Sequence, residues 1–260
     1  MYHKIVFTKF KENFVYRVDV IGGIINSFIE LVALWFVWNA IFASSGVLTI
    51  KGITLPAMIT YISISTVIRI YSHSYTEYMI HDDVKHGGIV VAITKPINYI
   101  FFVLSRELGI TFFRFIARGI PILLVAFIVL GAGLPLSPIF FFISFILGFF
   151  INFFLVLLIG LWSFWAGNIW GLRLSKNVIS DISSGAIFPL FLFPQWFQQI
   201  AYLLPFQAIY NIPLSIYIGQ ISGFEIYTFL LIQVFWFLSL GLIALIVWKF
   251  AQKKIFVQGG

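Results

Sequence analysis

The sequence contains no cysteine among its 260 residues. This absence excludes disulfides, thiolate metal ligands and a cysteine nucleophile, and it leaves the redox compartment undetermined. Charge is also scarce, since Asp, Glu, Lys and Arg make up 10% of the residues, where a soluble domain has about 25%. Hydrophobic residues reach 61%, and Phe alone occurs 32 times. A soluble fold of this length cannot bury so much apolar surface, so the composition excludes a soluble enzyme and a disordered chain and predicts an integral membrane protein.

Sequence motifs for nucleotide binding and for hydrolysis are also missing. No Gly-Lys pair occurs, so the chain lacks the phosphate-binding loop G-x-x-x-x-G-K-[ST]. Neither H-E-x-x-H nor G-x-S-x-G is present. His81 and His86, with Asp82 and Asp83 between them, are five residues apart and do not share a helix face, which makes a metal site there a poor interpretation. We expect no catalytic residue, no metal and no cofactor bound by this chain.

Long apolar runs predict transmembrane helices. The strands of a membrane barrel are about ten residues of alternating character, whereas the run over 138–161 is almost continuously apolar. About 20 helical residues cross a hydrocarbon core of about 30 Å. The sequence therefore predicts a single all-α membrane domain over 1–260 with six transmembrane spans. We expect these spans over approximately 20–43, 54–72, 110–132, 138–165, 179–194 and 223–248, of which the fifth is the shortest.

The basic residues indicate how the six spans are oriented. Of the 16 Lys and Arg residues, only Lys51 falls in an expected outer loop. Because basic residues are enriched in cytoplasmic segments, we expect a multi-pass protein of the plasma membrane with both termini in the cytoplasm. The net charge of +7 belongs to this asymmetry and not to nucleic-acid binding, since no basic face stands apart from the membrane.

The first 16 residues have the pattern of an amphipathic helix. Phe7, Phe10 and Phe14 recur at helical spacing, and charged side chains fall on the other faces. Such a helix is suited to the cytoplasmic headgroup layer, in contact with membrane lipids, and a frayed polar tail is the alternative. The pattern does not fit a cleavable signal peptide.

The cytoplasmic segment between the second and third spans is expected to contain a short helix. Asp82 is a candidate N-cap, the stretch 89–93 is apolar, and Pro96 disfavours helix at Lys95. A short helix within 82–95 that lies parallel to the membrane cannot bury its apolar face alone, so it is suited to docking on another protein. A solvated connector is the alternative interpretation.

A long helical pattern follows, from 97 to about 132. It exceeds the thickness of the bilayer, so we expect its first part along or below the inner surface and a bend near Gly119 and Pro121. Glu107, Arg114 and Arg118 share one stripe of this helix. We expect the two arginines to reach the lipid headgroups as anchors, and contact with a substrate is the less favoured alternative.

Prolines break the last apolar stretch before the sixth span. Two short apolar segments follow Pro194, and the second of them is too short to cross and is interrupted by Pro213. The first is aromatic and amphipathic, as interfacial helices are. These features predict an outer re-entrant helical hairpin over 195–220 that dips into the outer leaflet and packs on a partner or lines an exit.

Two stretches carry a resemblance to a known family. One is Gly-Gly-Ile-Val-Val-Ala-Ile-Thr-Lys-Pro at 87–96, and the other is the pattern of Ser, Gly, Phe, Pro and Trp residues between Ser184 and Pro213. Together with the Gly259-Gly260 ending, they resemble the permease subunits of ATP-binding cassette (ABC) exporters of the type V fold. That class moves drugs, polysaccharides or lipids outward. The resemblance covers nearly the whole chain, and its motifs specify no substrate.

The resemblance implies a six-span permease that pairs with a second permease, identical or homologous, and binds separate ABC ATPase subunits that carry the ATP and Mg. The pathway would run between the two first-half bundles. Contact with the ATPase maps onto Asp82, Asp83, Val84, Lys85, His86, Gly87, Gly88, Ile89, Val90 and Val91. The hairpin residues implied to face outside are Pro194, Trp196, Pro205, Phe206 and Pro213.

Glu30 is the one carboxylate well inside a predicted span, and Asn26 lies beside it on the helix. An ionisable group there is costly and is a functional candidate. It could contact a cationic substrate, pair with Arg69 of the next span, or stay protonated, and the sequence leaves these alternatives open. Asn152 could add polarity to the pathway or bond between helices.

A secondary, proton-coupled transporter that uses Glu30 is the rival class. A single intramembrane carboxylate, the lack of a detectable repeat, and broken helices at the outer edge instead of the midplane count against it. A purely structural membrane subunit would leave the cytoplasmic segment without a role.

Overall fold

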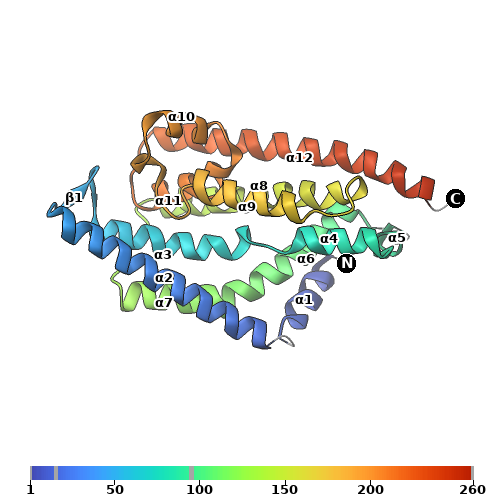
Figure 1. Ribbon diagram of the computed structural model, residues 1–260, viewed down its shortest axis with the longest axis horizontal. Helices are drawn as coiled ribbons and strands as arrows, with labels where there is room; N and C mark the ends of the chain where they lie inside the picture. The colour runs from blue at the N-terminus through green and yellow to red at the C-terminus, as the bar shows by residue number, and fades with distance from the viewer. Residues whose placement is uncertain (1, 15–16, 94–96, 259–260) are drawn as a thin grey trace.

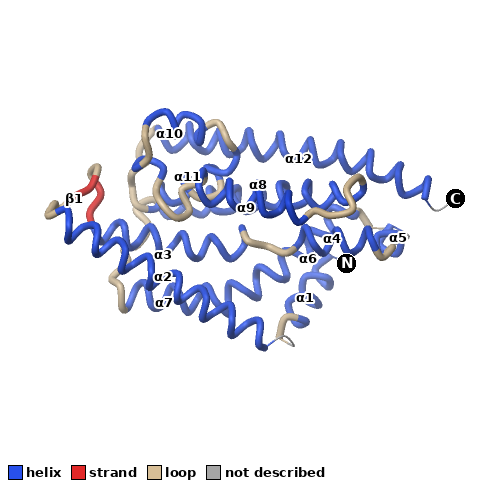
Figure 2. The backbone as a smooth tube through the Cα atoms, in the orientation of Figure 1, coloured by secondary structure: helices blue, strands red, loops and turns tan. Residues whose placement is uncertain are grey.

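A computed structural model describes residues 2–14, 17–93 and 97–258 (Figure 1). Most of these residues are helical, as the tube in Figure 2 shows, and they form an all-α membrane protein. Five stretches of the described residues are long and apolar enough to cross a membrane: Val20–Ser45, Leu55–Lys85, Tyr99–Ile128, Pro138–Phe164 and Glu225–Lys254. They lie roughly along the long axis of the molecule, with both ends of the chain and α5 at one end and β1 at the other.

The long helices agree with four of the predicted spans. Helix α2 (Arg17–Ser45) covers the first, α3 (Leu55–Ser72) the second, α8 (Pro138–Leu161) the fourth and α12 (Glu225–Gln258) the sixth. Helix α8 is central and packs against α12, α4 (Thr76–Lys85) and α11 (Asn211–Tyr217).

The second candidate span is interrupted between α3 and α4, where residues 73–75 leave the helix. A break in lipid needs protein partners for the freed backbone groups. Two buried side chains provide them, since Asn152 Nδ2 donates to the Tyr71 carbonyl at 3.0 Å and Lys176 Nζ donates to the Ser72 carbonyl at 3.2 Å. The bond from Asn152 ties the break to α8, and the bond from Lys176 ties it to α9 (Trp170–Ser183).

The third span is a helix with a π-turn inside it. Helix α6 (Tyr99–Arg114) passes into the π-helix Phe115–Gly119 and then into α7 (Ile120–Ile128). Pro121 has no N–H to donate to the preceding turn, and the Ile120 N–H instead reaches back five residues to the Phe115 carbonyl. The irregularity therefore lies where the sequence predicts a bend, next to Gly119 and Pro121.

The predicted fifth span over 179–194 is wrong as a single helix. Helix α9 begins at Trp170, nine residues earlier than predicted, and ends at Ser183. Gly185 then adopts a φ of +85°, which ends a right-handed helix, and Pro189 starts an extended segment that leads to the short helix η3 (Leu190–Leu192).

Two short helices and a connecting turn follow η3. The two helices are α10 (Gln195–Tyr202) and α11, and the turn between them is η4 (Pro205–Ala208). The chain is thus broken into short helices, as the prolines predict. Helix α11 is buried throughout, and Pro213 lies within it.

A small β-hairpin takes the place of the loop predicted between the first and second spans. Strands β1 (Thr49–Ile50) and β2 (Ile53–Thr54) pair antiparallel, and Lys51 and Gly52 form the two-residue turn with positive φ. Lys51 Nζ donates to the Phe191 carbonyl at 2.7 Å, so this hairpin contacts η3 at the same end of the molecule.

The predicted N-terminal helix is present as α1 (Tyr2–Glu12), and residues 1, 15 and 16 of the prediction lie outside the described residues. It packs on α6, where a side chain at Gly109 would collide with the Val6 carbonyl. Phe10 and Phe14 stack edge-on against Phe113, with centroids 5.8 and 4.7 Å apart. A close helix–helix contact therefore holds α1 to the third span.

Candidate functional site

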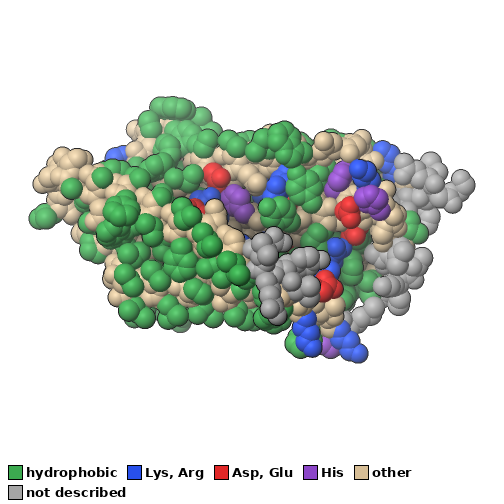
Figure 3. Space-filling view, turned by 60° about the horizontal axis from the view of Figure 1, so that its bottom comes forward, with side chains coloured by type: hydrophobic (Ala, Val, Ile, Leu, Met, Phe, Trp, Pro, Cys, Tyr) green, Lys and Arg blue, Asp and Glu red, His purple; other side chains and the backbone are tan. Residues whose placement is uncertain are grey.

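A polar cavity of about 350 Å³ opens between α2, α3 and the π-turn of the third span. It lies in an otherwise apolar region, and Figure 3 shows acidic, basic and histidine side chains gathered among hydrophobic ones on that face. Its lining residues are Asn26, Ser27, Glu30, Thr66, Arg69, Ile70, His73, Tyr75, Arg114 and Arg118.

Arg69 is the centre of the charges in this cavity. Its Nε lies 2.7 Å from Glu30 Oε1 on α2, and its Nη1 lies 3.0 Å from Asp181 Oδ1 on α9. His73 Nε2 is 3.6 Å from the second oxygen of Asp181. One guanidinium thus joins three helices, and the side chains of Arg69, Glu30 and Asp181 are only 17%, 26% and 24% exposed.

Glu30 therefore forms the pair with Arg69 that the sequence left open, and it also lines the cavity. Asp181 is a member of this network that sequence reasoning missed. Its place two residues before the helix end at Ser183 gave no signal, because the contact joins residues more than a hundred positions apart.

Changing Glu30 to Gln removes one charge and leaves Arg69 its bond to Asp181. We expect a loss of about 1 kcal/mol in stability, because the pair is partly exposed and Gln can still accept a hydrogen bond. We expect transport to fall, since the cavity loses a carboxylate. Wild-type transport together with wild-type thermal stability in Glu30→Gln would remove Glu30 from the pathway.

The two arginines of the third span lie in the wall of the cavity, and their reach to the lipid headgroups stays a prediction. Both line the cavity, with the Arg114 guanidinium 5.8 Å from the Tyr75 ring centroid. The Arg118 guanidinium occupies the space beside Gly23 of α2 that a Cβ would fill. The extra residue in the π-turn at 115–119 rotates this part of the stripe toward α2 and α3.

Glu107, the third member of that predicted stripe, lies elsewhere. It is 3% exposed, and its carboxylate accepts hydrogen bonds from the Ser74 hydroxyl at 2.8 Å and from the Thr76 hydroxyl. Glu107 thus ties the start of α4 to α6.

Asn26, one of the predicted pathway residues, lines the cavity, whereas Asn152, another, does not. Asn152 is 4% exposed, and its bond to the Tyr71 carbonyl supports the break between α3 and α4. Its role in the structure is the interhelical bond that the sequence left as an alternative.

The predicted ATPase-contact segment is an elbow of two helices. Helix α4 ends at Lys85, Gly87 turns the chain with a φ of +74°, and α5 (Gly88–Ile93) follows. The prediction that Asp82 is an N-cap is wrong, because Asp82 lies inside α4. Its carboxylate there is 2.9 Å from His86 Nδ1. Lys95 and Pro96 lie outside the described residues.

The residues of this elbow divide into exposed and buried ones. Asp82 and His86 are 72% and 65% exposed at the side chain, and Val90 is also exposed. Ile89 is buried, and Asp83 pairs with Arg106 of α6.

The remaining residues of the predicted contact segment are partly or fully exposed where the structure describes them. Val84 and Gly88 are half-buried, Lys85 and Gly87 are exposed, and the side chain of Val91 lies outside the described ones.

A buried ion pair joins α4 to α9. Glu77, in the first turn of α4, is fully buried, and its Oε1 lies 2.8 Å from Arg173 Nε. The Arg173 guanidinium also stacks on Tyr75 and Tyr78, with its carbon 4.6 and 4.8 Å from the ring centroids. Together with Asp83–Arg106, this pair fixes α4 to its neighbours on two sides.

The five predicted hairpin residues lie at the end of the molecule away from α5. Trp196 is 63% exposed on α10, and Pro194 precedes that helix. Pro205 and Pro213 are buried, and Phe206 packs against the core. They do not join the cavity around Arg69.

Comparison with known proteins supports a transport role for this arrangement. No curated protein matches the chain. A sequence model described as ABC-2 family transporter protein matches residues 28–259, which begins within α2 and includes the other long helices, the elbow, α10 and α11. The chain belongs to the ABC-2 family of transporter proteins, as a membrane permease component of an ABC transporter.

Proposed function

We propose that this permease is the membrane subunit of an ATP-driven exporter, which works as a dimer of permeases coupled to separate ABC ATPases. The observation that carries the proposal is the elbow of α4 and α5. Its tip exposes Asp82, His86 and Val90, while buried ion pairs hold the rest of α4 to the bundle. An exposed tip on a firmly attached helix is what a separate motor protein needs in order to move the bundle.

The proposed topology has six crossings, with both termini and the elbow in the cytoplasm of a plasma-membrane protein. The fifth crossing is made by α9 and the largely non-helical segment 184–194, in which only η3 is helical. Non-helical backbone at membrane depth must be satisfied by protein. In support, the Tyr61 hydroxyl donates to the Gly185 carbonyl at 2.7 Å and the Ser65 hydroxyl donates to the Ala186 carbonyl.

The movement of the elbow is proposed to reach the cavity through two rigid connections. The Glu77–Arg173 pair would carry it to α9, where Asp181 contacts Arg69. Glu107 would carry the movement to α6, and the two arginines of the cavity lie at the end of α6 and in the π-turn that follows it. Residues 73–75 let α4 change direction without bending α3, so the motor's contact can differ between two conformations.

The substrate pathway is proposed to pass along the polar cavity, between this subunit and a second permease. The outer helices α10 and α11 form the re-entrant hairpin at the exit. ATP and Mg belong to the ATPase subunits, and the catalytic step takes place there. The rival proton-coupled mechanism is less well supported, because Glu30 is already paired with Arg69 at 2.7 Å.

The elbow provides the test of this proposal. We expect deletion of residues 84–91 to abolish co-purification of the ATPase and ATP-dependent export of lipid or hydrophobic-cation probes. We expect Asp82→Lys to weaken ATPase binding by about tenfold, because reversing one exposed charge at an interface changes affinity by about 1–2 kcal/mol.

The matched control is Lys51→Glu, a charge reversal in the hairpin at the opposite end of the molecule. It should leave ATPase binding unchanged. Wild-type ATPase binding and export in both elbow variants would refute the proposed coupling.

A further inference from the structure

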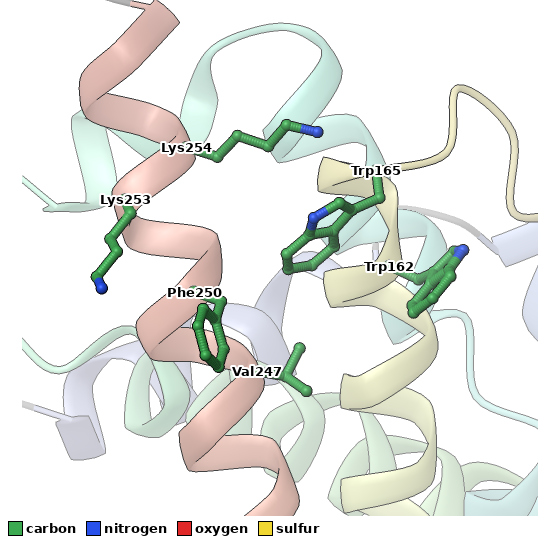
Figure 4. Close-up of a pocket in the computed structure, with 6 residues that line it drawn as sticks. All are labelled: Trp162, Trp165, Val247, Phe250, Lys253 and Lys254. Atoms are coloured by element: carbon green, nitrogen blue, oxygen red, sulfur yellow. The ribbon is translucent and has the colours of Figure 1, made fainter.

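A second cavity, of about 450 Å³, lies at the elbow end of the molecule, between the end of α8 and the end of α12. Figure 4 shows the residues that line it. Trp162 and Trp165 come from the turn η2 (Trp162–Phe164) and the residue after it, and four residues come from α12: Val247, Phe250, Lys253 and Lys254. Its volume is within the range of about 300–1,000 Å³ that is typical of small-ligand sites.

The charge of this cavity is positive. None of the six lining residues is acidic. The sequence reinforces this, because no Asp or Glu follows Glu225 and none occurs between Glu107 and Asp181. The two lysines therefore have no acidic residue near them on either of the elements that build the cavity.

The ammonium groups of the two lysines are held in place beside aromatic rings. Lys254 Nζ donates to the Phe164 carbonyl at 2.7 Å and lies 5.7 Å from the centroid of Trp165. Because an ammonium group has three donors, two remain for a ligand. Lys253 Nζ is 5.7 Å from the centroid of Phe250, on the other side of the helix end in Figure 4.

The rest of the lining is apolar and open to the lipid. Trp162, Trp165 and Phe250 are 51%, 43% and 58% exposed. The exposed stripe continues along α12 through Ile246 and Ile243, one and two turns further from the lysines. A ligand that fits this site has an anionic head beside the lysines and an apolar tail along α12.

We propose that this cavity binds one anionic phospholipid of the inner leaflet, with its phosphate at the Lys254 ammonium group and an acyl chain along α12. Lys253, on the other side of the helix end, adds positive charge near the headgroup. The combination of exposed tryptophan and phenylalanine side chains with two lysines matches a lipid better than a soluble anion, because a soluble anion would leave these apolar side chains uncovered. The assignment to the inner leaflet rests on the proposed topology, whereas the binding of an anionic phospholipid in this cavity does not.

The test is native mass spectrometry of the detergent-purified protein during titration with phosphatidylglycerol, and with phosphatidylcholine of the same acyl chains. We expect one phosphatidylglycerol to bind in preference. We expect Lys253→Gln/Lys254→Gln to weaken this binding by roughly thirtyfold, the effect of two cations near an anionic headgroup. Trp165→Ala should also weaken it, because the apolar wall is lost.

Lys249→Gln is the matched control, since Lys249 is exposed on the same helix and does not line the cavity. It should leave the lipid preference unchanged. An equal loss in Lys249→Gln, no loss in the double variant, or displacement of the lipid by inorganic phosphate at millimolar concentration would each overturn the proposal. So would a double variant that keeps its lipid and loses only the ATPase. A negative result in this lipid-binding test would not contradict the proposed export function, because that function is tested separately with the elbow variants.

Discussion

Replacing Glu77 with Gln is expected to lower the free energy of unfolding by about 3–5 kcal/mol. Glu77 has no exposed surface, and its carboxylate lies 2.8 Å from Arg173 Nε. Removing the charge leaves the guanidinium, whose side chain is only 18% exposed, without its carboxylate. The loss should appear as a fall in the thermal unfolding temperature in detergent and in the amount of protein that reaches the membrane.

Two further variants separate this ion pair from a general loss of polarity. The destabilisation of Glu77→Gln/Arg173→Gln should be smaller than the sum of the destabilisations of its single variants. Each single variant leaves one buried charge without its partner, whereas the double variant leaves neither charge. Asp82→Asn, five residues later on the exposed side of α4, should stay within about 0.5 kcal/mol of wild type. Wild-type stability in Glu77→Gln would show that the pair does not hold α4 to α9.

Replacing Arg69 with Gln should have the second large effect. Its guanidinium contacts both Glu30 and Asp181, and its loss leaves both carboxylates without that cation. We expect a destabilisation of several kcal/mol and the loss of export, because unpaired like charges in a low-dielectric environment repel strongly. Thermal unfolding and vesicle export of the same preparation measure the two effects together.

The suppressor for this variant is Glu30→Gln. In the double variant Glu30→Gln/Arg69→Gln one of the two unpaired carboxylates is gone, so stability should recover part of the loss. Arg69→Lys should not restore export, because a lysine cannot reach both carboxylates with the geometry of a planar guanidinium. A double variant that is less stable than Arg69→Gln alone would contradict this network.

The spans made of uninterrupted apolar residues could be predicted from the sequence because hydropathy is a local property. The ends of α2, α3, α8 and α12 agree with the predictions within a few residues at most boundaries, and α12 continues further at its end. The bend near Gly119 was also predictable, since Pro121 lacks the N–H that a regular helix requires.

The fifth span was misplaced for a physical reason. Hydropathy joined the end of α9 to the apolar residues 186–193 and read one helix. The conformation of Gly185 ends α9, and the hydroxyls of Tyr61 and Ser65 satisfy the backbone that follows. Those partners lie more than a hundred residues away in the sequence, so the local pattern contains no trace of them.

The elbow was predicted as one short helix because 71–87 is polar and appears to be a connector. In the structure α4 is stabilised by Arg173 and Arg106, which belong to other helices. The pairing of Glu30 with Arg69 was among the open alternatives. The bond of Asp181 to Arg69 and the position of Arg118 in the cavity were not predictable without the tertiary arrangement.

The absence of cysteine makes the central claim directly measurable. A single cysteine introduced at His86, at the exposed tip of α4, should form an intersubunit cross-link with the ATPase when a short bifunctional thiol reagent is added to membranes that contain both proteins. A cysteine at Leu48, which is 91% exposed at the opposite end, should form none. Cross-linking at His86 and not at Leu48 is the result that the account predicts. Cross-linking at Leu48 alone, or at neither position while the two proteins still co-purify, would contradict the claim that the elbow receives the motor.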